Sequence, residues 1–436
     1  MRAEIRDDYL ENLLHGREAV ADAGSVWLRA LRMRAVERAN ELTVPTIRDE
    51  EWRFTDLSPL YRIPFRPSTS AGALEKSQIA GFVIPEAETR LVFVDGRFLA
   101  DLSHVQTHDG VSVANLADVS RSVEIVAETH LTKLASIDDD AFAAVNTAFL
   151  RDGAVIHVAR DRVADAPIHL LFIATCKDSA AYPRVLVVAE PGAQCLVVED
   201  FVGVADGTYL TDAVSEIYVG ENARVSHVKL QREALTAFHI ANTSVRVAHG
   251  GCYATWAVAL GARLSRHNLS ITQAGEATEF SVDGLALIGE RQLADMHSSI
   301  DHAYAHGRSR QLHKTVVGGG AHAVFNGKIF VREGAQQTDS GQQSRNLLIS
   351  DKARVDTKPQ LEIFADDVKC AHGATVGQLE ADELFYLKSR GLSDTTARNL
   401  LTYAFAAQVI ERIPVKSLLD RLKKTVLEQT QTREPV

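Results

Sequence analysis

The sequence lacks closely spaced cysteine pairs and long apolar runs. Its four cysteines, at positions 176, 195, 252 and 370, include no CxxC spacing, which argues against a zinc knuckle or a thioredoxin motif. The longest apolar runs, such as 170–174, are too short to span a bilayer. The first residues, MRAEIRDD, contain no apolar stretch of the secretory type. We therefore expect a cytoplasmic protein, not associated with membranes, whose cysteines stay free thiols.

The sequence also lacks an excess of basic residues and the common catalytic motifs. Lys and Arg number 47 against 57 Asp and Glu, and the formal charge is −10. Such a chain is a poor candidate for nucleic-acid binding, because phosphate contact needs a basic face. No GxxxxGK[ST], GxGxxG, GxSxG or HExxH motif occurs, and Gly327-Lys328 lacks the preceding glycine because position 322 is His. Nucleotide hydrolysis, dinucleotide binding, serine hydrolysis and zincin chemistry therefore lose their usual markers.

What is present is the composition of a globular protein with a large core. Hydrophobic residues make up 46% of the 436 residues and charged residues 24%. The length suggests two or three domains, although a repetitive β-architecture can form a longer single unit.

The first 80 residues predict a helical N-terminal domain and a linker. Leucines at 10–14 and apolar residues at 27–31 recur at helical spacing, which indicates helix over the first sixty residues. Pro45 interrupts this pattern and opens the segment PTIRDEEWRFTDL, which ends at Leu57. Prolines and serines at 58–72 then mark a linker. We expect this domain to be joined loosely to the rest.

Residues 81–380 predict a mainly β core. Short runs such as LVFVDG, AVIHVARD, VLVVAEPGA and SEIYVGENA end at Gly, Asn or Asp, and one helix is expected at Asp138–Leu150. Turn signals at 192, 222 and 250 lie 30 and then 28 residues apart, and those at 320, 334 and 352 lie 14 and then 18 apart. Strand-and-turn units at such periods are typical of a solenoid. We favour a parallel β-helix, with a large β-sandwich as the alternative.

Residues 381–436 predict a helical C-terminal domain. One helix covers 382–390 and ends at Gly391, and Ser393 is a suitable N-cap for the next helix, which Pro414 ends. A third apolar stripe runs from Val415 to Val426. These stripes either pack only on each other and on the solenoid, or also form a docking surface for a partner.

Cys370 and His372 are the first candidate site. On a strand the two side chains face the same side, about 6.6 Å apart at the backbone, and a thiolate and an imidazole can both bind a soft or borderline metal. Zinc or an iron–sulfur cluster normally takes about four protein ligands, so the others would come from elsewhere, such as another subunit. Spacing alone favours a buried cysteine beside a turn histidine.

Two further groups support rival functions. A stand-alone metal carrier would use a histidine-rich stretch, in which the residues at 302 and 306 share a face in either a helix or a strand. Its members are His297, His302, His306, His313 and His322. A β-helix polysaccharide lyase would use Glu362, Asp366 and Asp367. The ordinary alternatives are histidines satisfied by hydrogen bonds and a solvated turn, and we also read the cysteines at 176, 195 and 252 as core thiols.

The segment 323–391 resembles a known family. It contains AVFNGKIFV, AQQTDSGQQSRNLLIS, VDTKPQLEIFADDVKCAHGATVG and LFYLKSRGL, and EEWRFTDL and DGAVIHV extend the similarity over most of the chain. These strings are similar to the SufB/SufD family of iron–sulfur cluster assembly proteins. Within the family, DVKCAHGAT is the SufD form, and the N-terminal cysteine-rich motif of many SufB proteins is missing.

The resemblance implies a right-handed parallel β-helix flanked by helical domains and a non-enzymatic scaffold function. It implies a SufB-like subunit as a partner, with Cys370 and His372 near the interface contributing ligands to a transient iron–sulfur cluster. It also implies a SufC-like ATPase that docks on the C-terminal helices. The docking candidates are Leu384, Phe385, Leu387, Leu400, Leu401 and Phe405. Some family complexes associate with reduced flavin, no stable cofactor is expected in the isolated chain, and an open β-helix end invites a homodimer.

Overall fold

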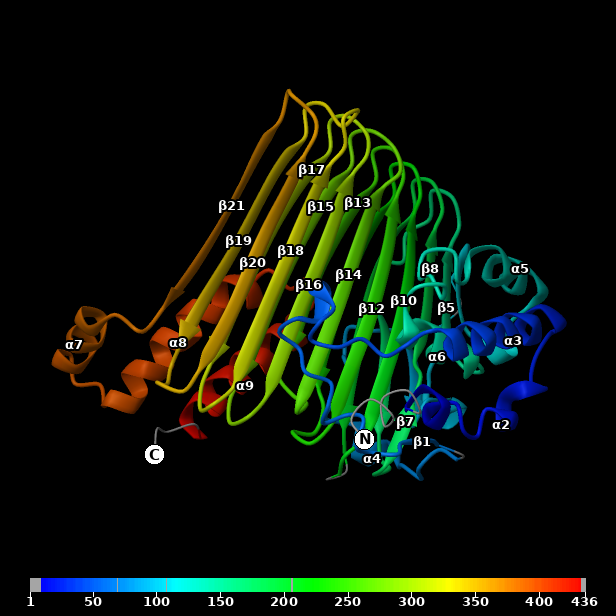
Figure 1. Ribbon diagram of the computed structural model, residues 1–436, viewed down its shortest axis with the longest axis horizontal. Coiled ribbons are helices and arrows are strands. Elements are labelled where there is room, and N and C mark those ends of the chain that lie inside the picture. Colours follow the sequence, from blue (N-terminus) through cyan, green and yellow to red (C-terminus); the bar gives the residue numbers. More distant parts are fainter. Residues whose placement is uncertain (1–8, 69, 107, 205–206, 433–436) are drawn as a thin grey trace.

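The computed structural model describes residues 9–68, 70–106, 108–204 and 207–432, and two β-sheets form the body of the molecule (Figure 1). From β8 onward the chain alternates between them, even-numbered strands in sheet A and odd-numbered strands in sheet B. Each circuit therefore adds one strand to each sheet, which is the winding of a β-solenoid.

The elements have the following bounds. Sheet A contains β1 (Arg66–Pro67), β4 (Val111–Asn115), β5 (Ala154–Val158), β7 (Ser179–Ala181), β8 (Arg184–Ala189), β10 (Leu210–Val219), β12 (Phe238–Val247), β14 (Leu264–Gln273), β16 (Leu293–His302), β18 (His322–Val331) and β20 (Arg354–Ile363). Sheet B contains β2 (Thr89–Val94), β3 (Arg97–Phe98), β6 (Ile168–Ala174), β9 (Gln194–Gly203), β11 (Arg224–Arg232), β13 (Cys252–Ala259), β15 (Glu279–Ile288), β17 (Arg308–Val317), β19 (Asp339–Leu348) and β21 (Lys369–Gly377). The helices are α2 (Glu18–Ala21), α3 (Val26–Glu41), α4 (Lys76–Ile79), α5 (Arg121–His130), α6 (Ala141–Ala148), α7 (Ala381–Ser389), α8 (Asp394–Ile410) and α9 (Lys416–Thr432).

Parallel, in-register pairing places like residues above one another. Inside the solenoid an aliphatic ladder crosses five strands of sheet A, and its side chains are buried. Its members are Ile217, Val245, Ile271, Ile300 and Ile329. Because successive residues of a strand face opposite sides, the positions between them form the outer face. The predicted mainly β solenoid with parallel strands is confirmed.

The turn signals read from the sequence mark the corners of the coils. Asn222 and Gly250 both adopt positive φ, 56° and 62°, which Gly tolerates because it lacks a Cβ and Asn because its short polar side chain can hydrogen-bond locally. The alanines at 193, 223, 321 and 335 are completely buried beside the corners. Small residues recur there because each corner stacks directly on the next.

The N-terminal segment packs firmly on the outer face of sheet A, so the prediction of a loosely joined cap is wrong. Its leucines at 10–14 share a buried cluster with Phe238 and Ile240 of β12, and the ring of Phe65 lies 6.0 Å from that of Phe238. Helix over the first sixty residues is also wrong beyond α3, because residues 42–60 contain only a 3-10 turn at Glu50–Trp52. The helix expected near residue 140 is α6, whose N-cap Asp140 accepts two backbone N–H bonds.

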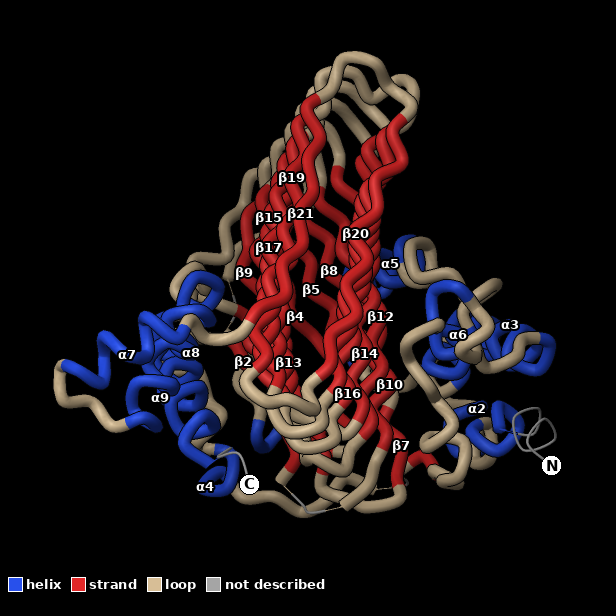
Figure 2. The backbone as a smooth tube through the Cα atoms, turned by 60° about the vertical axis from the view of Figure 1, so that its left-hand side comes forward, coloured by secondary structure: helices blue, strands red, loops and turns tan. Residues whose placement is uncertain are grey.

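The C-terminal helices lie along sheet B, on the opposite side of the solenoid from α2, α3, α5 and α6 (Figure 2). As predicted, Gly391 ends α7 at a φ of 91°, and the Ser393 hydroxyl caps α8 by accepting from the Thr396 N–H at 3.1 Å. In the part of the chain that the structure describes, no helix is long and apolar enough to cross a membrane.

Candidate functional site

The solenoid ends in two strands, β20 and β21, beyond which no further strand of the described residues is stacked. In the described chain, β20 pairs in its sheet only with β18, and β21 only with β19. Val376 of β21 is 50% exposed, and Phe364, just after β20, is 59% exposed. At the other end each sheet closes with a short antiparallel strand, β3 or β4. The uncapped end therefore offers both unpaired strand edges and apolar side chains to a partner.

Cys370 and His372 lie on this last strand. Their register partners are Ser340 and Gln342, whose side chains are buried inside the solenoid, so both candidates project from the interior side of β21. Cys370 is partly buried against Val331 and its neighbours, whereas His372 is exposed. Burial raises the pKa of the Cys370 thiol, so a metal would have to displace its proton. Both groups remain reachable from the uncapped end.

The two groups do not form a complete metal site within the chain. Among the described residues, no three His, Cys, Asp or Glu side chains are placed to hold one ion. Zinc and iron–sulfur clusters normally take about four protein ligands. Any cluster held here would therefore take its remaining ligands from another molecule.

The structure does not bring the five candidate histidines together. His297 faces outward and forms ion pairs with Asp295 and Glu51, whereas His302 and His313 are buried inside the solenoid. The predicted shared face at 302 and 306 is wrong, because β16 ends at His302 and His306 lies in the following turn. The remaining histidine, at 322, bonds to Asp356 at 2.7 Å.

Two of these histidines should make the fold acid-sensitive. Burial lowers the pKa of His302 to about 4 and of His313 to about 3. The unfolded chain therefore binds more protons below about pH 6.5, and stability falls as the pH drops from there toward the folded pKa values. At pH 5 each of the two histidines should lower the free energy of unfolding by about 2 kcal/mol relative to pH 7.

The non-titrating variant His313→Gln tests this effect by urea unfolding at pH 7 and pH 5. The variant should lose about 2 kcal/mol less than the wild-type protein between the two pH values. The exposed His249→Gln serves as the control and should behave as wild type. Equal losses in wild type and His313→Gln would show that His313 takes up no proton on unfolding.

The carboxylates of the rival polysaccharide lyase site do not converge among the described residues. Glu362 bonds to Lys328 at 2.7 Å, and the aspartates at 366 and 367 lie exposed in the bend after β20, as expected of a solvated turn.

The interpretation of three core thiols holds only for Cys195, where burial raises the pKa to about 12. It is wrong for Cys176 and Cys252, which are partly exposed at strand ends.

The C-terminal helices carry uncovered apolar side chains. Phe385 is 74% exposed and its neighbour Tyr386 57%, and α7 contains no buried residue. On α8, Leu400 is also exposed. The other predicted docking residues, Leu384, Leu387, Leu401 and Phe405, are partly buried. A helix with exposed aromatic side chains usually packs against another surface, and few side chains of the described chain cover α7.

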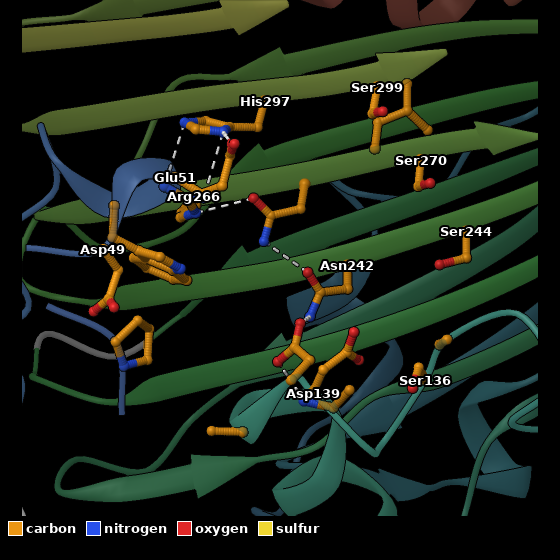
Figure 3. Close-up of a pocket in the computed structure, with 18 of the residues that line it drawn as sticks. Asp49, Glu51, Ser136, Asp139, Asn242, Ser244, Arg266, Ser270, His297 and Ser299 are labelled. Atoms are coloured by element: carbon orange, nitrogen blue, oxygen red, sulfur yellow. Dashed lines mark hydrogen bonds and ion pairs between the residues drawn. The ribbon is translucent and has the colours of Figure 1, made fainter. Parts of the chain in front are cut away.

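A groove of about 910 Å³ lies on the outer face of sheet A, roofed by residues 42–52 and bordered by 135–143 (Figure 3). The buried carboxylate of Asp295 organises its base. It pairs with Arg266 at 2.5 Å and with His297 at 2.9 Å, and it accepts a bond from the Thr55 hydroxyl. Burial opposes ionisation of Asp295, yet Arg266 and then His297 lower its pKa to about 2.

This network explains the segment EEWRFTDL. Trp52 lies against the Arg266 guanidinium, 3.7 Å from ring centroid to Cζ, and Glu51 reaches His297 at 3.4 Å. The segment therefore supplies an aromatic face, a carboxylate and a hydroxyl to charges on two neighbouring strands, β14 and β16. Sequence reasoning singled out the segment and His297 but missed Arg266 and Asp295, because only the register of β14 and β16 places them side by side.

Comparison with known proteins agrees over nearly the whole chain. A family model described as SUF system FeS cluster assembly, SufBD core domain, matches residues 172–405, and one for the SufBD protein N-terminal region matches residues 3–170. An iron–sulfur cluster assembly SufBD family protein of Synechocystis is 41% identical, over 91% of this chain and 89% of its own length. The iron–sulfur cluster assembly protein SufD of Escherichia coli is 33% identical over 90% of both chains, and chloroplastic protein ABCI7 of Arabidopsis thaliana is 31% identical over 98% and 91%.

Proposed function

The chain belongs to the SufBD family of iron–sulfur cluster assembly proteins, and we propose that it is a SufD-like, non-enzymatic scaffold subunit of a cytoplasmic assembly complex. The observation that carries the proposal is the uncapped end of the solenoid, where β20 and β21 have strand edges that no other strand of the described chain pairs with, and exposed apolar side chains.

A SufB-like subunit is the proposed partner for this end. A second solenoid of the same coil dimensions can continue both sheets by pairing with β20 and β21, since an edge strand is a ready template for another. Pro359 lies on β20 and cannot donate a backbone bond, so it restricts which register the added strand can take. The right-handed sense of the solenoid is part of this proposal. In isolation, two copies of the chain can use the same surface to form a homodimer.

The nascent iron–sulfur cluster is the cargo at this junction. Cys370 and His372 would supply part of its ligand set from the interior side of β21, and the partner would supply the rest. Because a thiol must lose its proton to bind metal, cluster loading would release that proton. Reduced flavin remains an expectation from the family, and it plays no part in these steps.

The exposed face of α7 and α8 is the proposed docking site for a SufC-like ATPase. Replacing Phe385 with aspartate should reduce the co-purified ATPase by at least about tenfold, because a buried aromatic anchor commonly contributes on the order of 2 kcal/mol to an interface. The amount of ATPase retained on the tagged full chain gives the measurement.

Val26→Asp is the matched control, since Val26 is 72% exposed on α3, on the opposite side of the solenoid. It should leave ATPase binding unchanged. Equal retention by wild type and Phe385→Asp would place the ATPase elsewhere, and no retention by the wild type would argue against the scaffold function itself.

A further inference from the structure

A second groove lies on the outer side of sheet B, where the last strands pass α8. It has a volume of about 650 Å³ and is lined by residues of β15, β17, β19, β21 and α8, with His372 at its border. The groove is deep because its floor carries no side chain larger than a methyl group. The floor residues are Gly341, Ala371 and Gly373. At Gly373 an added Cβ would meet no atom within 4 Å, so this floor is open. The volume lies within the range of about 300–1,000 Å³ usual for small-molecule sites.

The groove is strongly basic on a chain whose net charge is −10. Three arginines line it, Arg310 from β17, Arg345 from β19 and Arg412 from the turn after α8, whereas Asp283 is its sole lining carboxylate in the described chain. Asp283 pairs with Arg412 at 3.2 Å, and Arg310 reaches Asp339 outside the groove at 2.7 Å.

Arg345 has no such compensation. Its guanidinium donates a hydrogen bond to the amide oxygen of Gln343 at 3.1 Å, and no carboxylate pairs with it in the described part of the chain. The positive potential also reaches Lys314 nearby: burial first, and then Arg345 and Arg412, lower the pKa of that lysine to about 8. Two of the three arginines are thus paired with a carboxylate, and Arg345 supplies the charge that an anion in the groove would neutralise.

We propose that this groove binds a small phosphorylated anion through Arg310, Arg345 and Arg412. A guanidinium group can donate two parallel hydrogen bonds to two oxygens of one phosphate group. Its planar arrangement of N–H donors therefore matches the geometry of a phosphate. The glycine and alanine floor leaves room for the ligand, and the outer side of β21 keeps it apart from the thiol of Cys370, which faces the interior. This site is independent of the scaffold function proposed above.

Calorimetric titration of the purified full chain with inorganic pyrophosphate, at about 0.15 M salt, tests the proposal. The wild type should bind, and Arg345→Gln and Arg412→Gln should each weaken binding by about tenfold or more, since a charge-assisted hydrogen bond contributes that much. Gly373→Glu should abolish binding, because it places a carboxylate on the open floor without a steric clash.

Arg354→Gln is the control, an exposed arginine at the start of β20 that pairs with Asp356 at 2.8 Å. It should bind pyrophosphate as the wild type does. Absence of binding to the wild type would overturn the proposal, and so would equal weakening by Arg354→Gln, because that result would mean general attraction to basic residues. Circular dichroism of each variant checks that the fold is retained.

Discussion

Replacing Asp295 with asparagine should lower the free energy of unfolding by about 3–5 kcal/mol, the usual cost of breaking a buried ion pair by removing one partner. Asparagine keeps the volume but loses the charge, so the buried Arg266 guanidinium would remain without its carboxylate. Urea unfolding at pH 7 measures the loss. The change should also release the segment around Thr55, which bonds to the same carboxylate, and trypsin should then cleave faster at Arg48 or Arg53.

Asp301→Asn is the matched control on the same strand. Asp301 also faces outward and pairs with an arginine, Arg332, at 2.6 Å, but the Arg332 side chain is 57% exposed. An exposed pair contributes only about 0–1 kcal/mol, so this variant should unfold nearly as the wild type does. If Asp295→Asn lost no more than Asp301→Asn, the network beneath EEWRFTDL would not be what anchors the N-terminal segment.

The solenoid could be predicted from the sequence because its corners are local. Turn residues with positive φ, such as Gly192, Asn222 and Gly250, recur about one coil apart, and that repeat is visible without knowing which strands pair. The C-terminal helix boundaries were predictable for the same reason: Gly391 and Ser393 act on their own neighbours.

The attachment of the N-terminal segment was not predictable, because it depends on strand register. Trp52, Arg266 and Asp295 are far apart in the sequence and meet only when β14 and β16 align on the outer face. The histidine stretch failed as a metal site for a related reason. A strand sends alternate residues to opposite sides, so residue 297 faces outward and residue 302 inward, and no spacing argument tells which side is core.

Cys370 and His372 at the uncapped end show both what the sequence could predict about the site and what it could not. Strand alternation predicts that Cys370 and His372 share a face, and the register with Ser340 and Gln342 identifies that face as the interior side. The sequence alone could not tell whether further coils cover β21. That β21 is the last strand of its sheet is a property of the whole topology, and it turns an interior position into an accessible one.

Removing both candidate ligands should abolish most of the cluster while leaving the complex assembled. The double variant Cys370→Ser/His372→Ala is reconstituted with a SufB-like subunit and a SufC-like ATPase. We expect its iron and sulfide content to fall at least about tenfold below that of the wild-type complex. Mutating even a residue that only supports a metal ligand lowers metal affinity by about 10–100-fold. Visible absorption and iron content measure the cluster, and size-exclusion chromatography measures assembly. The exposed His372 should be replaceable without loss of stability, whereas Cys370 packs beside Val331 and Ala335, so serine is the mildest change there.

Cys176→Ser is the control, a partly exposed cysteine that follows β6 near the other end of the solenoid. It should leave both cluster content and assembly as in the wild type. An intact complex with an unchanged cluster in the double variant would remove the ligand role and leave the scaffold role standing. Failure to assemble would instead mean that the two side chains serve the interface, since both project where a partner's first coil would lie. The two roles therefore separate on one pair of measurements, because a ligand acts on the cluster and an interface residue acts on the complex that holds it.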